Sequence, residues 1–139
     1  MYVIGHIILF VTITEQQKKL PVMVWIHGGA FFTGSNDPFM YGPHYFYERN
    51  SENHEVIVVT VNYRLGVLGF LSFENEMAPG NLGLRDQNLA LRWINKYISK
   101  FGGDPDNVVL FGLSAGGQST YFNIMSPVSK RLFHKVSVY

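Results

Sequence analysis

Apolar runs alternate with glycine- and proline-rich turns along the chain and predict the strands of a sheet. The segments 21–27, 56–62 and 107–113 are apolar on both faces, which is typical of central strands in a sheet whose faces are covered. The segments 8–13 and 135–139 are rich in β-branched residues and predict two further strands. The pattern therefore predicts five strands.

A helical period appears after residue 84. Apolar residues recur there at spacings of three and four, at Ala90, Leu91, Ile94, Tyr97, Ile98 and Phe101. Gly102 is expected to end this helix, and the segment 104–106 predicts a turn. A second helix is expected from Ser114 to Pro127, and a short one at 45–51. Because strands and helices alternate, we expect an α/β fold: a partial, mostly parallel sheet with helices on both faces.

The composition of the chain excludes several classes of function. The chain has 139 residues, of which 47% are hydrophobic and 15% charged, so it can bury a core and is not a disordered polypeptide. Its net charge of +1 does not indicate the positively charged surface that is typical of nucleic-acid-binding proteins. The absence of cysteine excludes disulfides, thiolate metal sites and cysteine nucleophiles. The upstream histidines show no metal-ligand spacing, so we predict no metal and no cofactor.

The apolar stretch 3–13 has two interpretations. It is apolar enough for the core of a signal peptide, but no basic segment precedes it, and the polar run 14–19 stands where small cleavage-site residues are expected. Eleven residues are too few for a membrane-spanning helix. The β-branched residues of 7–13 favour a strand. The sequence assigns no localisation and no oligomeric state.

The segment 112–116 reads Gly-Leu-Ser-Ala-Gly and lies between a predicted buried strand and a predicted helix. A serine on such a turn adopts a strained backbone conformation, and its hydroxyl projects above the carboxyl edge of the sheet. Gly112 and Gly116 avoid clashes around it. The alternative is a helix start rich in small residues, without chemistry. In this strand–turn–helix setting the pattern favours Ser114 as a nucleophile.

A second glycine-rich turn, His27-Gly28-Gly29-Ala30, directly follows another predicted buried strand. Acyl transfer needs N–H donors aimed at the carbonyl oxygen as it becomes tetrahedral, and a turn without bulky side chains can supply them. An ordinary strand-to-loop turn is the alternative. Beside the Ser114 turn, we interpret these residues, together with the amide of Ala115, as a predicted oxyanion hole.

The chain resembles the type-B carboxylesterase and cholinesterase-like family of the α/β-hydrolase fold. The resemblance begins near Leu20 and extends to the end of the chain. It is carried by ordered blocks at 21–29, 62–66, 69–72, 78–81, 86–87, 90–93, 101–105, 112–116 and 126–127. It identifies residues 1–139 as an incomplete, N-terminal portion of such a domain, with residues 1–19 outside the matching blocks.

The resemblance implies a serine hydrolase whose substrates are small-molecule carboxylic esters. Ser114 would attack the acyl carbon, a histidine would accept its proton, and an acidic residue would orient that histidine. The family's oxyanion donors match the amides of Gly29, Ala30 and Ala115, with Gly28 shaping the turn. Two positions depart from the family pattern: Leu113 stands where Glu is usual, and Ala30 stands where a third glycine is usual.

The catalytic acid and base of this fold follow the serine in sequence. The segment 115–139 contains no Asp or Glu, and its single histidine is His134, which we interpret as a surface or strand-edge residue. We therefore expect the chain to lack its triad partners and to be inactive alone. A catalytically inactive adhesion or binding module is the alternative function. Leu113 and the missing downstream half favour it, whereas the presence of Ser114 with both flanking glycines favours the esterase.

Two further groups have structural interpretations. Aromatic residues at 39, 41 and 45–47 line an ester-binding gorge or pack on the body of the domain, and packing is favoured. Arg64 and Asp86 are expected to form an ion pair beneath the site, with a structural role.

Overall fold

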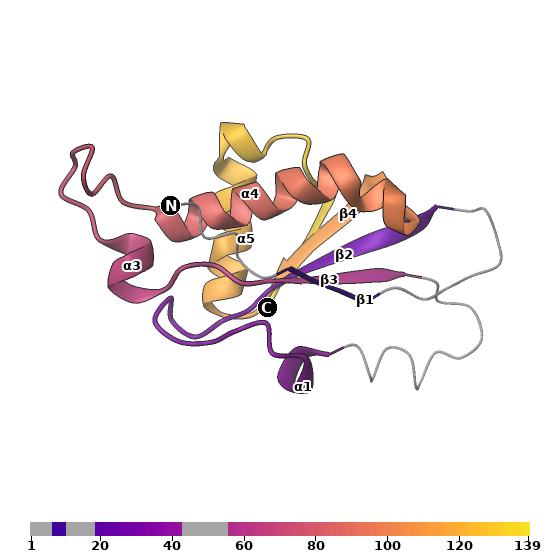
Figure 1. Cartoon of the computed structure of the whole chain (residues 1–139), viewed down its shortest axis with the longest axis horizontal. Helices are drawn as coiled ribbons and strands as arrows, with labels where there is room; N and C mark the ends of the chain where they lie inside the picture. The colour runs from indigo at the N-terminus through magenta and orange to yellow at the C-terminus, as the bar shows by residue number, and fades with distance from the viewer. Residues whose placement is uncertain (1–6, 11–18, 43–55) are drawn as a thin grey trace.

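A five-stranded sheet organises the molecule (Figure 1). The computed structural model describes residues 7–10, 19–42 and 56–139. The strands are β1 (Ile7–Phe10), β2 (Leu20–Ile26), β3 (Ile57–Val61), β4 (Gly103–Gly112) and β5 (Lys135–Val138), in the spatial order β1-β3-β2-β4-β5. β1 is antiparallel to β3, and the other neighbours are parallel. All five predicted strands are confirmed, although 11–13 of the first lie outside the described residues.

Two long helices follow the sequence pattern. α4 (Leu82–Tyr97) continues into the 3₁₀ helix η1 (Ile98–Phe101) and ends at Gly102, whose φ of 82° suits a residue without a side chain. α5 (Ala115–Met125) ends before Pro127, which begins the 3₁₀ helix η2 (Pro127–Ser129). The described part of the chain also contains two short helices, α1 (Pro38–Tyr41) and α3 (Gly66–Phe70). The helix predicted at 45–51 lies outside it.

The turn predicted at 104–106 is instead part of a bulged strand. Gly103 pairs with Leu20, and the next paired residue of β4 is Val108, opposite Val22. The Asp104 carboxylate accepts a hydrogen bond of 3.0 Å from the Asp106 N–H, which is a local turn inside the strand. The expectation that the turn precedes the strand was wrong, because pairing with β2 continues on both sides of the turn and places it inside β4.

The core lies between one face of the sheet and α4. Buried residues of β2, β3 and β4 pack against the buried face of the helix; they include Val22, Val24, Ile26, Val59, Val61 and Leu110 on the sheet, and Leu91, Ile94 and Ile98 on the helical side. Each is almost completely withdrawn from water, and burial of each is worth roughly 1.5–3 kcal/mol. This packing fixes α4 across the sheet.

α5 lies on the same face as α4, whereas α1 lies against the opposite face (Figure 1). On that opposite face, the Trp25 ring contacts Tyr41 of α1 at 5.5 Å and Phe111 of β4 at 5.0 Å, measured between ring centroids. Tyr41 therefore packs on the sheet, as the sequence favours, while Phe39 is exposed. The predicted α/β fold with a mostly parallel sheet is confirmed.

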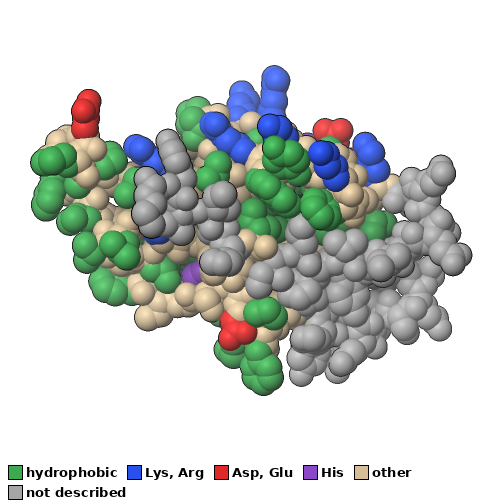
Figure 2. Space-filling view, viewed as in Figure 1, with side chains coloured by type: hydrophobic (Ala, Val, Ile, Leu, Met, Phe, Trp, Pro, Cys, Tyr) green, Lys and Arg blue, Asp and Glu red, His purple; other side chains and the backbone are tan. Residues whose placement is uncertain are grey.

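The surface differs between the ends of the molecule (Figure 2). Lys and Arg side chains gather over α4 and η1, where Arg92, Lys96 and Lys100 are exposed. Hydrophobic side chains gather at the α3 end, where Leu68 and Met77 are among the exposed apolar residues. No helix in the described residues is long and apolar enough to cross a membrane.

Candidate active site

Ser114 occupies the turn between β4 and α5, where the sequence predicts it. Its backbone has φ 55° and ψ −119°, a conformation that costs a residue other than glycine about 1–3 kcal/mol. The side chain is exposed, and its hydroxyl makes no hydrogen bond to a described residue. The Ser114 N–H donates to the Tyr139 carbonyl at 2.9 Å, and the Tyr139 N–H donates to the Gly112 carbonyl at 3.1 Å. The strained turn is thus held from both sides by the residue that follows β5.

The glycines that flank the serine turn, Gly112 and Gly116, lie where a side chain would not fit. A side chain at Gly116 would overlap the carbonyl of Ile26, at the end of β2. One at Gly112 would overlap the backbone of Gly116. The first turn of α5 therefore packs directly against the ends of β2 and β4, which is possible only without a Cβ at these two positions. Their predicted role in shaping the turn rests on this close approach.

The glycine-rich turn after β2 lies against the serine turn. A Cβ on Gly28 would stand 2.7 Å from the Leu113 carbonyl oxygen and 3.3 Å from Ser114 Cβ. The two turns meet because β2 and β4 are neighbouring parallel strands whose ends, Ile26 and Gly112, are in register. Parallel strands bring their carboxyl ends to one edge, which is where such folds place their sites.

Three backbone amides at this edge are without partners in the described residues. The N–H groups of Gly29, Ala30 and Ala115 donate no hydrogen bond there. Gly29 and Ala30 have positive φ values of 111° and 53°, and the Gly29 carbonyl accepts the N–H groups of Phe32 and Thr33 at 2.9 Å each. The Gly29 carbonyl is therefore occupied by hydrogen bonds, whereas the amides of Gly29, Ala30 and Ala115 donate none within the described residues. These are the three donors that the sequence predicts for an oxyanion.

His27 supports the turn from below. Its buried ring stacks on Tyr63, with the centroids 4.6 Å apart, and its Nδ1 lies 2.8 Å from the Gly28 carbonyl oxygen. The Tyr63 hydroxyl donates to the His27 carbonyl at 2.9 Å. Burial lowers the pKa of His27 and raises the pKa of Tyr63 to about 12, so both side chains are neutral near pH 7. We assign this pair a structural role that the sequence pattern did not predict.

Arg64 and Asp86 form the predicted ion pair. The Arg64 Nε and Nη2 atoms each lie 2.7 Å from a carboxylate oxygen of Asp86, and the Arg64 N–H donates to the same group at 3.0 Å. These hydrogen bonds raise the pKa of Arg64. The pair joins the loop after β3 to α4 and is confirmed as a structural contact.

Comparison with known proteins identifies the family. A model of the carboxylesterase family matches residues 7–138. The chain belongs to the carboxylesterase family. It is 48% identical over 123 residues to human bile salt-activated lipase and 52% identical over 120 residues to the para-nitrobenzyl esterase of Bacillus subtilis. These alignments cover 87% and 85% of this chain, but only 16% and 24% of the relatives.

A solved structure of a thermophilic para-nitrobenzyl esterase superposes with a TM-score of 0.85 and 46% identity. It aligns with 95% of this chain, which spans 27% of that esterase. Juvenile hormone esterase from Manduca sexta superposes with a TM-score of 0.78 and 44% identity, over 84% of this chain and 21% of that one. The sheet, its helices and the serine turn therefore have the α/β-hydrolase fold.

Neither described histidine stands as a base beside Ser114. His27 is buried beneath the turn, and its Nδ1 is engaged with Gly28. His134 is exposed just before β5, and its Nδ1 accepts a hydrogen bond of 3.2 Å from the Val108 N–H. Val108 precedes the end of β4 by four residues, about 13 Å along a strand, so His134 lies at the strand edge, as the sequence predicts.

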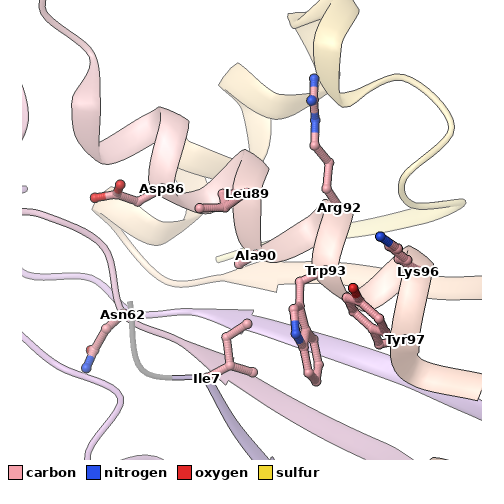
Figure 3. Close-up of a pocket in the computed structure, with 9 residues that line it drawn as sticks. All are labelled: Ile7, Asn62, Asp86, Leu89, Ala90, Arg92, Trp93, Lys96 and Tyr97. Atoms are coloured by element: carbon pink, nitrogen blue, oxygen red, sulfur yellow. The ribbon is translucent and has the colours of Figure 1, made fainter. Parts of the chain in front are cut away.

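A separate cavity of about 230 Å³ lies between α4 and the start of β1 (Figure 3). Trp93, Tyr97 and Ile7 form its apolar walls, and Lys96 lies at its side. None of the residues predicted for catalysis lines it.

Proposed function

We propose that Ser114 is the nucleophile of a serine hydrolase that cleaves small-molecule carboxylic esters through an acyl-enzyme. The observation that carries this proposal is the contact between the two turns. The exposed serine, strained at φ 55°, lies against a glycine turn whose amides are free among the described residues. This arrangement offers a nucleophile and oxyanion donors at one sheet edge.

In the proposed reaction, Ser114 Oγ attacks the acyl carbon while a histidine accepts the hydroxyl proton. The carbonyl oxygen gains negative charge, and the N–H groups of Gly29, Ala30 and Ala115 stabilise it. The histidine then protonates the departing alcohol, which leaves an acyl group on Ser114. Water, deprotonated by the same histidine, attacks the acyl carbon and releases the acid. The partial positive charge at the start of α5 adds to oxyanion stabilisation.

The histidine and its acidic partner are the components that the described residues do not bring to Ser114. The segment 115–139 contains no Asp or Glu, although the fold's triad order places the acid after the serine. We therefore propose that the 139 residues hold the nucleophile and the oxyanion donors and depend on further residues for the base.

A binding module without catalysis is the second candidate. It is favoured by Leu113, which is 49% exposed immediately before the serine where the resemblance expects a glutamate. A hydrophobic side chain there offers no charge to the site. In this case the serine turn would be retained only for its contribution to packing.

Labelling with a fluorophosphonate probe tests the choice. The 139-residue chain, the longest product of its gene and the Ser114→Ala variant of each would be treated in parallel, with Ser99→Ala as the control for an exposed serine outside the site. We expect labelling of the longest product that is lost in Ser114→Ala and kept in Ser99→Ala. Absence of labelling in the folded longest product would support the binding module instead.

A further inference from the structure

The Tyr63 hydroxyl lies where the two halves of the proposed oxyanion hole meet. It donates a hydrogen bond of 2.9 Å to the His27 carbonyl, which belongs to the peptide unit that enters the glycine turn. A Cβ on Gly116 would stand 2.9 Å from the same carbonyl oxygen, so that oxygen also faces the first turn of α5. The glycine turn carries two of the proposed donors, and α5 begins with the third. One hydroxyl therefore reaches the boundary between them.

The same hydroxyl also interacts with α5. Burial raises the pKa of Tyr63 to about 12, and a hydrogen bond with the Ser119 hydroxyl partly offsets this rise. Tyr63 has one proton, which it donates to the His27 carbonyl, so Ser119 is the donor in the second contact. Ser119 can supply that proton because its own oxygen accepts from Gln87 Nε2 at 2.9 Å. A directed chain of hydrogen bonds therefore runs from α4 through α5 to the glycine turn.

The glycine turn needs an external contact of this kind. The His27 carbonyl and the Gly28 N–H belong to one planar peptide unit, so a hydrogen bond that holds the carbonyl also fixes the backbone that leads to Gly29. Glycine residues themselves resist rotation of the backbone very little. The rings of His27 and Tyr63 are stacked, with an angle of 17° between their planes, which fixes the approach of the hydroxyl to the carbonyl. The amides beyond this carbonyl are therefore held in one direction from outside the turn.

Tyr63 is itself held in place by the fold. It follows β3 by two residues, and only 5% of its surface is exposed. The next residue, Arg64, donates its backbone N–H to the Asp86 carboxylate of α4 at 3.0 Å. Ser119 and Gln87 are also buried, so water is not at hand to replace the hydrogen bonds of the chain. The Tyr63 hydroxyl therefore has a fixed position relative to the sheet and to both helices.

We propose that Tyr63 is a positioning residue for ester cleavage: its hydroxyl fixes the separation between the amides of Gly29 and Ala30 on one side and the amide of Ala115 on the other. This inference rests on the proposed function and adds to it a residue that is neither a donor nor a nucleophile. An oxyanion donor contributes fully only at about 2.7–3.1 Å from the developing charge. Without the hydroxyl, the glycine turn shifts relative to α5, so the transition state is stabilised less while the uncharged ester binds as before.

Tyr63→Phe tests this proposal because it removes the hydroxyl and keeps the ring that stacks on His27. In the longest product of the gene, we expect a fluorophosphonate to label Ser114 about tenfold more slowly, less than the 10²–10³-fold loss typical of deleting a donor. For a small activated ester, kcat should fall by the same factor while KM changes by less than about twofold. Equal rates for Tyr63→Phe and the unsubstituted protein would overturn the proposal.

Tyr97→Phe is the matched control for removal of a tyrosine hydroxyl. Tyr97 is the last residue of α4, and η1 connects it to the start of β4, whereas the serine turn follows the end of β4. We expect Tyr97→Phe to be labelled at the unchanged rate. Equal losses in Tyr97→Phe and Tyr63→Phe would show that the position of the hydroxyl is irrelevant and would contradict the inference.

A third variant separates positioning from stability. Ile94→Val removes one methyl group from the buried face of α4 and should lower the urea midpoint about as much as Tyr63→Phe does. We expect Ile94→Val to be labelled at the unchanged rate. If labelling fell in both variants in proportion to the midpoint, Tyr63 would act through the stability of the fold alone, and the proposal would be wrong.

Ser119→Ala tests the path through α5. We expect about threefold slower labelling, because the Tyr63 hydroxyl keeps its bond to the His27 carbonyl but loses the bond that it accepts. The double variant Tyr63→Phe, Ser119→Ala should be labelled no more slowly than Tyr63→Phe, since Ser119 acts on the turn through Tyr63. Additive losses would contradict this path.

Hydrogen exchange follows the turn without requiring a reaction. The N–H groups of Phe32 and Thr33 donate to the Gly29 carbonyl, so their exchange rates report whether the turn is closed. We expect Tyr63→Phe to speed their exchange about three- to tenfold relative to the amides of β3, and Ile94→Val to leave this ratio unchanged. An unchanged ratio in Tyr63→Phe would overturn the proposal. If the fluorophosphonate does not label even the unsubstituted protein while the ratio changes as expected, the proposed function fails and the positioning of the turn by Tyr63 stands.

Discussion

Gln87 of α4 donates a hydrogen bond of 2.9 Å to the hydroxyl oxygen of Ser119 in α5, and both side chains are buried. The Asn123 amide donates to Gln87 Oε1 at 3.1 Å, and Ser129 Oγ donates to Asn123 Oδ1 at 2.7 Å. The two helices are therefore joined by polar groups that satisfy one another away from water. Because α5 starts at the serine turn, this network fixes the direction in which the turn faces.

Replacement of Gln87 by leucine is expected to destabilise the fold by about 1–3 kcal/mol, because Ser119 and Asn123 then lose partners in a buried setting. Urea unfolding followed by tryptophan fluorescence measures the change. Asn95→Leu, at an exposed position of the same helix, is the control and should alter the free energy of unfolding by less than about 0.5 kcal/mol. Similar losses in the two variants would show that the network contributes nothing specific.

Stability should fall as the solution is acidified below the ordinary histidine pKa of 6.5. His27 has a lowered pKa in the folded chain because of burial, so the unfolded chain binds its proton more readily. The contribution of His27 is therefore present above pH 6.5 and decreases as pH falls through and below that value. We expect a smaller pH dependence in His27→Phe, which keeps a ring to stack on Tyr63. Thermal unfolding between pH 5 and pH 8 measures it.

The exposed His134 provides the comparison for that experiment. His134→Gln removes the other described histidine, which is exposed and accepts a hydrogen bond from the Val108 N–H. If His134→Gln flattened the profile and His27→Phe did not, the assignment of the buried histidine as the source would be wrong.

Gly28→Ala should slow the reaction of Ser114 with a fluorophosphonate by tenfold or more in the longest product of the gene. The added methyl group would stand 2.7 Å from the Leu113 carbonyl oxygen, so the glycine turn must move away from the serine turn. Labelling rates and circular dichroism measured together separate this displacement from unfolding. Gly102→Ala is the matched control, since nothing lies within 4 Å of its added Cβ and only its φ of 82° opposes the change. Unchanged labelling of Gly28→Ala would show that the reactivity of Ser114 does not depend on the contact between the two turns.

The 139 residues on their own should not hydrolyse a small activated ester at an enzymatic rate. A serine hydroxyl is a weak nucleophile without a base, and oxyanion stabilisation and binding alone give only about 10³–10⁴-fold acceleration over water. The measurement compares purified chain with Ser114→Ala. Robust turnover that depends on Ser114 would show that a histidine of this chain serves as the base after all.

The sequence predicted the elements that depend on local pattern. The apolar runs became β2, β3 and β4, and the spacing from Ala90 onward became α4, because burial of an apolar face decides both. The serine turn was also predictable, since its glycines mark a backbone that admits no side chain. The Arg64–Asp86 pair followed from two complementary charges near the predicted site.

Features that depend on tertiary contacts were not predictable in the same way. The Asp104–Asp106 turn looks like the end of pairing, yet β4 pairs with β2 on both sides of it. Gln87 and Asn123 have the composition of a surface helix, and only the approach of α4 to α5 buries them. The cavity beside the glycine turn is lined by Ala30, Phe70, Leu84 and Phe122, which come from four segments, so no single stretch of sequence displays it.

The two hydrogen bonds of Tyr139 make the serine turn and the final strand one cooperative unit. Because Tyr139 accepts from Ser114 and donates to Gly112, β5 cannot detach from β4 without releasing the backbone of Ser114, the proposed nucleophile. In hydrogen exchange, the Ser114 and Tyr139 amides should then open together and share one protection factor. The backbone conformation of the proposed nucleophile therefore depends on a strand that carries none of the residues proposed for catalysis, and detachment of that strand would release the strained turn.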